Sequence, residues 1–152
     1  MGIPSIRSTK KNGDIRLVID FCKLNEWLKR KEYPLAMIEA ILTSIKGFKL
    51  ASVIDLNMGY LSIPLTEESK KLLTIVTPFG FYECQVLPMG VMPSTDIFQP
   101  RMVDIFAAMI ENKPDPYFDD ILHCQGANFD KHLAGLDEIL RRLKEAGMQV
   151  NL

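Results

Sequence analysis

The stretch Tyr117-Phe118-Asp119-Asp120, followed by Ile121 and Leu122, constrains this chain more than any other feature. The apolar residues around the two aspartates are of types that favour β-strands. Pro114 and Pro116, directly ahead, prevent a helix from running into the stretch. The pattern therefore predicts a short hairpin with two neighbouring carboxylates at its tip.

Adjacent carboxylates repel each other, and the repulsion costs free energy unless a cation or a hydrogen-bond donor compensates it. The pair therefore predicts a divalent-metal site, to which a second strand should contribute another acidic residue. Asp55, within the apolar stretch Val53-Ile54-Asp55-Leu56, fits because no basic residue lies beside it in the sequence. An alternative for Asp55 is a helix N-cap at the end of its strand.

Composition narrows the class of protein. The chain has 152 residues, of which 47% are hydrophobic and 24% charged, as in a single soluble globular domain. A net charge of −1 argues against a free-standing nucleic-acid binder, although basic residues occur in short clusters. No apolar run approaches the roughly 20 residues that span a bilayer, and the N-terminus does not read as a signal peptide. We therefore expect an intracellular location, cytoplasmic or nuclear, with no secretion and no membrane partner.

The three cysteines are widely spaced and form no CxxC pair, so we expect reduced thiols rather than a disulfide framework. Cys124 lies beside His123, and His132 follows, but this spacing is not that of a zinc site. Ordinary packing is the preferred interpretation of these residues.

Hydrophobic periodicity predicts an α+β fold. Residues 10–14 form a turn with a basic tip, residues 66–71 an exposed polar segment, and a helix begins near Ser94, whose hydroxyl caps it. From residue 48 onward we expect an antiparallel sheet with helices on one face, of the split βαβ, ferredoxin-like type. The predicted strands cover residues 15–21, 48–56, 73–77, 81–86, 117–122 and 148–152, and the predicted helices residues 34–45, about 94–112 and about 128–146.

Several blocks, in order along nearly the whole chain, resemble the fingers and palm of a reverse transcriptase of the long-terminal-repeat retrotransposon type. The blocks that carry this resemblance are Arg16-Leu17-Val18-Ile19-Asp20-Phe21, Tyr33-Pro34-Leu35, Asp55-Leu56-Asn57-Met58-Gly59-Tyr60, Thr77-Pro78-Phe79-Gly80-Phe81-Tyr82-Glu83, Leu87-Pro88-Met89-Gly90, Phe98-Gln99, Tyr117-Phe118-Asp119-Asp120 and Ala146-Gly147 with Asn151.

The resemblance implies one domain over residues 1–152, with about 1–47 and 66–90 as fingers and about 48–65 and 91–152 as palm. It also implies that thumb, connection and RNase H domains are absent from this stretch. The implied activity is RNA-directed DNA polymerisation, which transfers a nucleotide from a dNTP to a primer 3′-hydroxyl. The implied partners are an RNA or DNA template with its primer and the remainder of a retroelement polyprotein. We expect weak or no activity from this fragment alone.

The same resemblance assigns roles to individual residues. Asp55, Asp119 and Asp120 would be catalytic and, with the main-chain carbonyl of Leu56, would hold two Mg²⁺ ions about 3.5–4 Å apart, with Mn²⁺ as a possible substitute. Asp120 either reaches the site from the turn or supports it from outside, because neighbours on a strand point to opposite faces. The implied nucleotide-binding residues are Lys11, Arg16, Tyr60, Met89 and Gly90, and those beside primer and template are Tyr117 and Phe118.

Departures from the family pattern, among them Cys22 in place of a usual Arg and Thr95 in place of a usual Pro, bear on template handling more than on metal binding. Two other interpretations stay open. The chain is a non-catalytic retrotransposon remnant that at most binds nucleic acid or a partner, or it is another palm polymerase or a nucleotidyl cyclase-like enzyme. The Tyr-x-Asp-Asp box argues against the last of these. Taken alone, Tyr60 reads as a core tyrosine.

Overall fold

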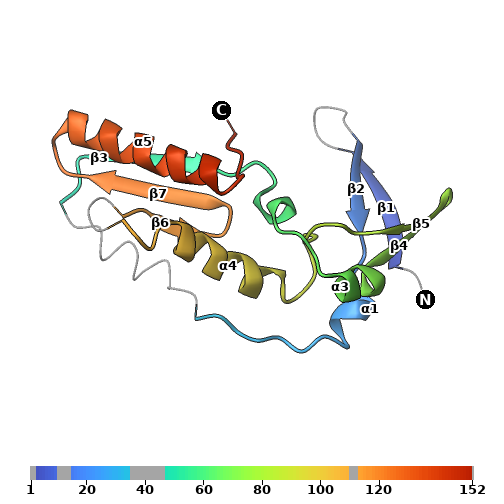
Figure 1. Cartoon of the computed structure of the whole chain (residues 1–152). Coiled ribbons are helices and arrows are strands. Elements are labelled where there is room, and N and C mark those ends of the chain that lie inside the picture. Colours follow the sequence, from blue (N-terminus) through green and yellow to red (C-terminus); the bar gives the residue numbers. More distant parts are fainter. Residues whose placement is uncertain (1–2, 10–14, 35–46, 110–112, 152) are drawn as a thin grey trace.

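The structure is a computed structural model that describes residues 3–9, 15–34, 47–109 and 113–151. Two sheets lie at opposite ends of the molecule in Figure 1, joined by extended segments. The strands are β1 (Ile3–Thr9), β2 (Ile15–Ile19), β3 (Leu50–Asp55), β4 (Thr74–Thr77), β5 (Gly80–Glu83), β6 (Asp115–Tyr117) and β7 (Asp120–Gln125). The helices are α1 (Cys22–Asn25), the 3₁₀ turn η1 (Gly59–Ser62), α3 (Glu67–Leu72), α4 (Ser94–Ile105) and α5 (Phe129–Glu145).

The three-stranded sheet has the order β3-β7-β6, and both pairings are antiparallel. The segment after α5 lies along the free edge of β3, where Val150 forms an antiparallel bridge with Leu56. The spatial order is thus β6, β7, β3 and the C-terminal segment, with α4 directly before β6 and α5 directly after β7. This arrangement confirms the predicted split βαβ fold.

Helices α4 and α5 cover one face of this sheet. Ile54 and Ile121 are directly opposite each other on β3 and β7, and both point into the core beneath the helices. Side chains from α4, from its C-cap residue Phe106 and from α5 complete that core and are almost fully buried, namely Phe98, Met102, Phe106, Ile139 and Leu143. The prediction of helices on one face is therefore confirmed.

The other face of the three-stranded sheet is open among the described residues, which corrects the expectation of an apolar setting for Asp55. Successive side chains on a strand alternate between faces. Ile54 is buried, whereas Val53 is 68% exposed and Asp55 is exposed as well. The apolar neighbours of Asp55 in the sequence therefore do not surround its carboxylate.

The four-stranded sheet has the order β2-β1-β4-β5. Strands β4 and β5 correspond to the predicted strands 73–77 and 81–86 and pair antiparallel, but in this second sheet rather than in the sheet expected from residue 48 onward. Strands β1 and β4 pair in parallel, with Ile3 opposite Ile75. Among the residues whose burial is described, its core contains Ile3, Phe21, Leu73 and Val91. Helix α3 was not predicted. Thr66 begins it as an N-cap, because its hydroxyl accepts a hydrogen bond from the Ser69 amide.

Two polar contacts tie the N-terminal segment to the loop and helix after Leu87. Asp96, at the start of α4, accepts hydrogen bonds from Arg30 Nε at 2.8 Å and Nη2 at 3.1 Å, and the Arg30 guanidinium lowers the pKa of that carboxyl. The side chain of Asn25 donates to the Gly90 carbonyl and accepts from the Met92 amide. The first contact joins the segment after α1 to α4, and the second joins α1 to the loop before α4.

The predicted end and the predicted N-terminal cap of helix α4 were wrong. Helix α4 ends at Ile105 rather than near residue 112, and the Ser94 hydroxyl donates to the Pro88 carbonyl instead of capping the helix. On α5, which confirms the predicted helix, Leu133 is 45% exposed while His132 is buried. The predicted helix over residues 35–45 and the turn at residues 10–14 lie outside the described residues. Within the part that the structure describes, no helix is long and apolar enough to cross a membrane.

Candidate active site

A row of four side chains crosses the open face of the three-stranded sheet at the end where β3 stops and β7 begins. Tyr117 is opposite Asp120, Asp120 is opposite Asp55, and Asn151 lies on the other side of Asp55. Residues directly opposite each other on antiparallel strands point to the same face and are close neighbours. Asp55 and Asp120 are therefore like-charged cross-strand neighbours, and both are exposed.

Asp119 lies in the two-residue turn between β6 and β7, not on a strand. Its carbonyl accepts a hydrogen bond from the Leu56 amide at 2.8 Å, which fixes the turn against the end of β3. Its Oδ1 is buried and has no hydrogen-bond partner among the described residues. Gly59 leaves the space for that oxygen, because a Cβ there would lie only 3.0 Å from it.

The pKa of Asp119 is raised above its ordinary value. Burial is the largest cause, and the neighbouring carboxylates of Asp55 and Asp120 add to it. Within the described part of the chain, no lysine or arginine forms an ion pair with any of the three. The three carboxylates therefore lie near one another at this end of the sheet without an ion-pair partner among the described residues.

Asp55 is not a helix cap. The turn η1 that follows has Met58 at its N-cap position, with no capping side chain. The Oδ2 of Asp55 instead accepts a hydrogen bond of 2.6 Å from Nδ2 of Asn151. The structure thus removes the alternative that the sequence left open for Asp55.

Gln99 of α4 binds the main chain of the β6–β7 turn. It was not identified from the sequence as a functional residue. It is 5% exposed, its Nε2 donates to the Pro116 carbonyl at 2.8 Å, and its Oε1 accepts from the Phe118 amide at 3.1 Å. Phe118 has a φ of 53°, which is unusual for a residue with a Cβ. The available signal in the sequence was the family block Phe98-Gln99, which gave Gln99 no role of its own.

Tyr60 packs as a core tyrosine. It is buried, its ring stacks on Phe98 with centroids 4.3 Å apart, and burial raises the pKa of its phenol. Phe98 and Asp119 both lie close to Gly59, the residue before Tyr60. The ring therefore lies behind the carboxylates in the core, and the structure does not place it on the open face.

The remaining predicted residues lie around this site or outside the described part of the chain. Met89 is 42% exposed, and Gly90 has a φ of 93° and a carbonyl bound by Asn25. Tyr117 and Phe118 meet edge to face, with ring centroids 4.4 Å apart. Lys11 lies outside the described residues, and for Arg16 the structure gives only its place in β2, opposite Ser8.

The carboxylate oxygens of Asp55, Asp119 and Asp120 suit a hard cation in their chemistry but not in their arrangement. An unpartnered buried carboxylate oxygen, as in Asp119, is a ligand that Mg²⁺ prefers. Among the described residues, however, no three His, Cys, Asp or Glu side chains converge into a preassembled metal site. The three aspartates are close enough to affect one another electrostatically, but their oxygens do not meet at one point.

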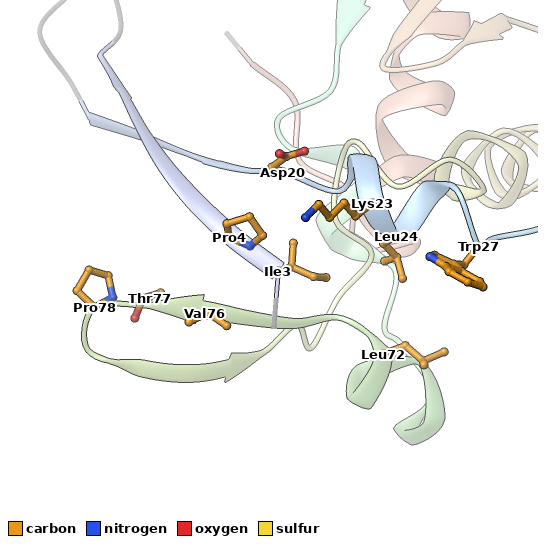
Figure 2. A pocket seen from close by; sticks show the side chains of 10 residues that line it. All are labelled: Ile3, Pro4, Asp20, Lys23, Leu24, Trp27, Leu72, Val76, Thr77 and Pro78. Carbon is orange, nitrogen blue, oxygen red and sulfur yellow. The ribbon is translucent and has the colours of Figure 1, made fainter. Parts of the chain in front are cut away.

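A cavity of about 770 Å³ lies elsewhere, between β1, α1 and β4. Figure 2 shows its wall of aliphatic side chains, with Lys23 and Asp20 on one side and Trp27 at one end. None of the residues that line it belongs to the predicted site. This cavity and the cluster of carboxylates are thus separate features of the molecule.

Comparison with known proteins places the chain in a family. Residues 8–152 match the family described as "Reverse transcriptase (RNA-dependent DNA polymerase)". The chain belongs to the reverse transcriptase family. The Transposon Tf2-3 and Tf2-7 polyproteins of Schizosaccharomyces pombe are each 30% identical to it over 142 residues, which are 93% of this chain and 11% of the polyprotein.

Solved structures of similar fold come from another reverse transcriptase. The native protease-reverse transcriptase of prototype foamy virus matches 99% of the chain and 20% of its own length, with a TM-score of 0.89 and 25% identity. The foamy viral enzyme in complex with an RNA/DNA hybrid matches over the same shares, with a TM-score of 0.87 and 25% identity. The chain therefore has the fold of one part of a reverse transcriptase and spans about a tenth of the length of the polyproteins that it matches.

Proposed function

We propose that this chain is the fingers and palm module of an RNA-directed DNA polymerase, in which Asp55, Asp119 and Asp120 are the catalytic carboxylates. Residues 1–47 and 66–90 would form the fingers, and residues 48–65 and 91–152 the palm. The template, the primer and a dNTP would be its ligands, and a longer polyprotein would supply the parts that hold them. The family and the fold support this proposal.

The observation that carries it is the unpartnered Oδ1 of Asp119. Burying a carboxylate oxygen without a donor costs free energy, and the raised pKa of Asp119 reflects that cost. A structural aspartate is normally satisfied by a donor or a basic partner. Here Gly59 and Gln99 position the turn so that the oxygen stays free, which suits a ligand awaiting a cation.

Asp119 and Asp55 would be the principal metal ligands, with the Leu56 carbonyl beside them and Asp120 on the open face. Bound Mg²⁺ would neutralise phosphate charge and lower the pKa of an attacking hydroxyl. The residues themselves orient the ligands: the Leu56 amide fixes the Asp119 main chain, and β7 fixes Asp120 opposite Asp55. Since the three carboxylates do not converge in the described chain, we expect cation binding to draw them together.

Asp120 differs from Asp119 in its role. It lies on the first residue of β7, points to the same face as Asp55, and is exposed. We propose that it reaches the site from the open face, where primer and nucleotide would lie. Lys11, Arg16, Met89 and Gly90 would bind the nucleotide, and Tyr60 would support that pocket from the core.

The test is Mg²⁺-dependent extension of a DNA primer on an RNA template by this chain, measured beside Asp119→Asn. A parallel measurement follows Mn²⁺ binding by electron paramagnetic resonance. The control is Asp130→Asn, because Asp130 is an exposed aspartate at the distant start of α5. We expect Asp119→Asn to abolish the weak extension that the parent shows and to weaken Mn²⁺ binding at least about tenfold, and Asp130→Asn to change neither.

Two outcomes would contradict parts of the proposal. Equal background extension by the parent and by Asp119→Asn, with Mn²⁺ binding retained by the parent, would mean that this stretch alone is not a polymerase. Absence of Mn²⁺ binding by the folded parent would remove the metal site as well. That second result would favour a non-catalytic retrotransposon remnant.

A further inference from the structure

The segment after α5 is held firmly beside the carboxylates. Gly147, with a φ of 74°, ends the helix, and the Met148 amide donates to the Leu143 carbonyl at 2.8 Å. Met148 is buried in the core, and its sulfur accepts a hydrogen bond from the Ser62 hydroxyl. The chain therefore leaves the helix in a fixed direction, along the edge of β3.

Backbone pairing then places Asn151 next to Asp55. The Asn57 amide donates to the Gln149 carbonyl at 2.8 Å, and the Asn151 amide donates to the Asp55 carbonyl at 2.9 Å. The side chain repeats this contact, since Nδ2 of Asn151 donates to Oδ2 of Asp55 at 2.6 Å. Asn151 thus binds both the main chain and the carboxylate of the same residue.

The chemistry of this contact differs from that of an ordinary ion pair. Asp55 has the carboxylate of Asp120 on one side and the neutral amide of Asn151 on the other. A lysine or arginine in that place would neutralise Asp55 and compete with a cation. An amide compensates one oxygen by a hydrogen bond, fixes the orientation of the carboxylate, and leaves its negative charge available.

We propose that Asn151 is a positioning residue for Asp55: it holds Oδ2 so that Oδ1 remains available to a divalent cation shared with Asp119. This inference rests on the proposed function. Metal-binding carboxylates are commonly oriented by such outer hydrogen bonds, and loss of one typically weakens metal binding about 10–100-fold. In the sequence, Asn151 stood out only as a member of a family block, with no role for its side chain.

The test compares Asn151→Ala with Gln149→Ala in the whole chain, by electron paramagnetic resonance titration with Mn²⁺. Gln149 is exposed on the same segment and accepts the Asn57 hydrogen bond through its main-chain carbonyl, so its truncation keeps the backbone pairing. We expect Mn²⁺ affinity to fall about 10–100-fold in Asn151→Ala and to stay within about twofold of the parent in Gln149→Ala. Circular dichroism confirms that both variants are folded.

A double variant separates positioning from a general structural role. If Asn151 acts through Asp55, then Asn151→Ala should weaken Mn²⁺ binding no further in an Asp55→Asn background. Unchanged affinity in Asn151→Ala, equal losses in Asn151→Ala and Gln149→Ala, or additive losses in the double variant would each overturn the inference. No Mn²⁺ binding by the parent would overturn the proposed function itself, so the two failures are distinguishable.

Discussion

The two sheets differ in how completely their residues are packed. Beneath the three-stranded sheet, Phe98, Met102 and Phe106 are fully buried and form part of one continuous core with α5. Among the residues whose burial the structure describes, the core of the four-stranded sheet has four buried members, and the β4–β5 hairpin exposes Phe79 by 79% and Phe81 by 74%. The carboxylates lie on the well-packed sheet.

This difference indicates a division of roles. A dense core offsets the free-energy cost of holding like charges together, so the uncompensated aspartates lie where packing is strongest. Asp20, the residue after β2, is held differently: hydrogen bonds with the side chain and then the main-chain amide of Cys22 lower the pKa of its carboxyl.

We expect the largest difference between the two sheets in how much replacing a phenylalanine by alanine lowers the free energy of unfolding. Phe98→Ala should lower the free energy of unfolding by about 3–5 kcal/mol, because it removes a fully buried ring stacked on Tyr60. Phe81→Ala removes a ring that is mostly exposed and should change stability by less than about 0.5 kcal/mol. Urea unfolding followed by circular dichroism measures both.

The comparison would fail if the two substitutions had similar costs. A large cost for Phe81→Ala would mean that the hairpin ring is buried in solution, for example against a second copy of the chain. Repeating the unfolding at two protein concentrations detects that case, since the midpoint then depends on concentration.

We expect the next largest loss of stability when Gly59 is replaced by alanine, with Gly126 as the comparison. A Cβ at Gly59 would lie 2.8 Å from Phe98 Cζ and 3.0 Å from Asp119 Oδ1, so Gly59→Ala should cost about 1–3 kcal/mol by overpacking. Gly126→Ala is the matched control, because no atom lies within 4 Å of a Cβ there. Its effect on the urea midpoint should be near zero. Equal midpoints for the two variants would show that the site adapts to the added methyl group.

Periodicity and turn residues were sufficient to predict the elements of the three-stranded sheet. The strand-forming apolar residues around Asp119 and Asp120, with prolines directly ahead of them, predicted the hairpin that β6 and β7 form. Gly147 predicted the end of α5. Both predictions rest on a few neighbouring residues. Such short patterns predict the structure correctly when tertiary contacts favour the same local conformation.

Features that depend on distant contacts could not be predicted. The parallel pairing of β1 with β4 joins residues about 70 positions apart, and no residue type marks it. Ser94 is a good capping residue, yet its hydroxyl binds the Pro88 carbonyl, because the preceding loop returns to it. Asn151 and Gln99 are polar residues whose partners lie on other elements, so their roles appear only in three dimensions.

We expect the smallest change in stability from replacing two aspartates, Asp119 and Asp20, whose pKa values shift in opposite directions. The folded-state pKa of Asp119 is raised, so its ionisation opposes folding: its contribution favours the folded state at low pH and is lost as pH rises through the folded-state pKa. Asp119→Asn should therefore stabilise the chain at pH 7, by roughly 0.5 kcal/mol after solvent screening, and the gain should shrink toward pH 4.

The folded-state pKa of Asp20 is lowered, so its stabilising contribution is present at neutral pH and lost as pH falls. Asp20→Asn should accordingly lower the Tm at pH 7. Thermal unfolding at pH 7 and pH 4, without divalent cations, measures both variants. A Tm at pH 7 that falls in Asp119→Asn would show that Asp119 has a donor in the folded state, and that its Oδ1 is not held free for a cation.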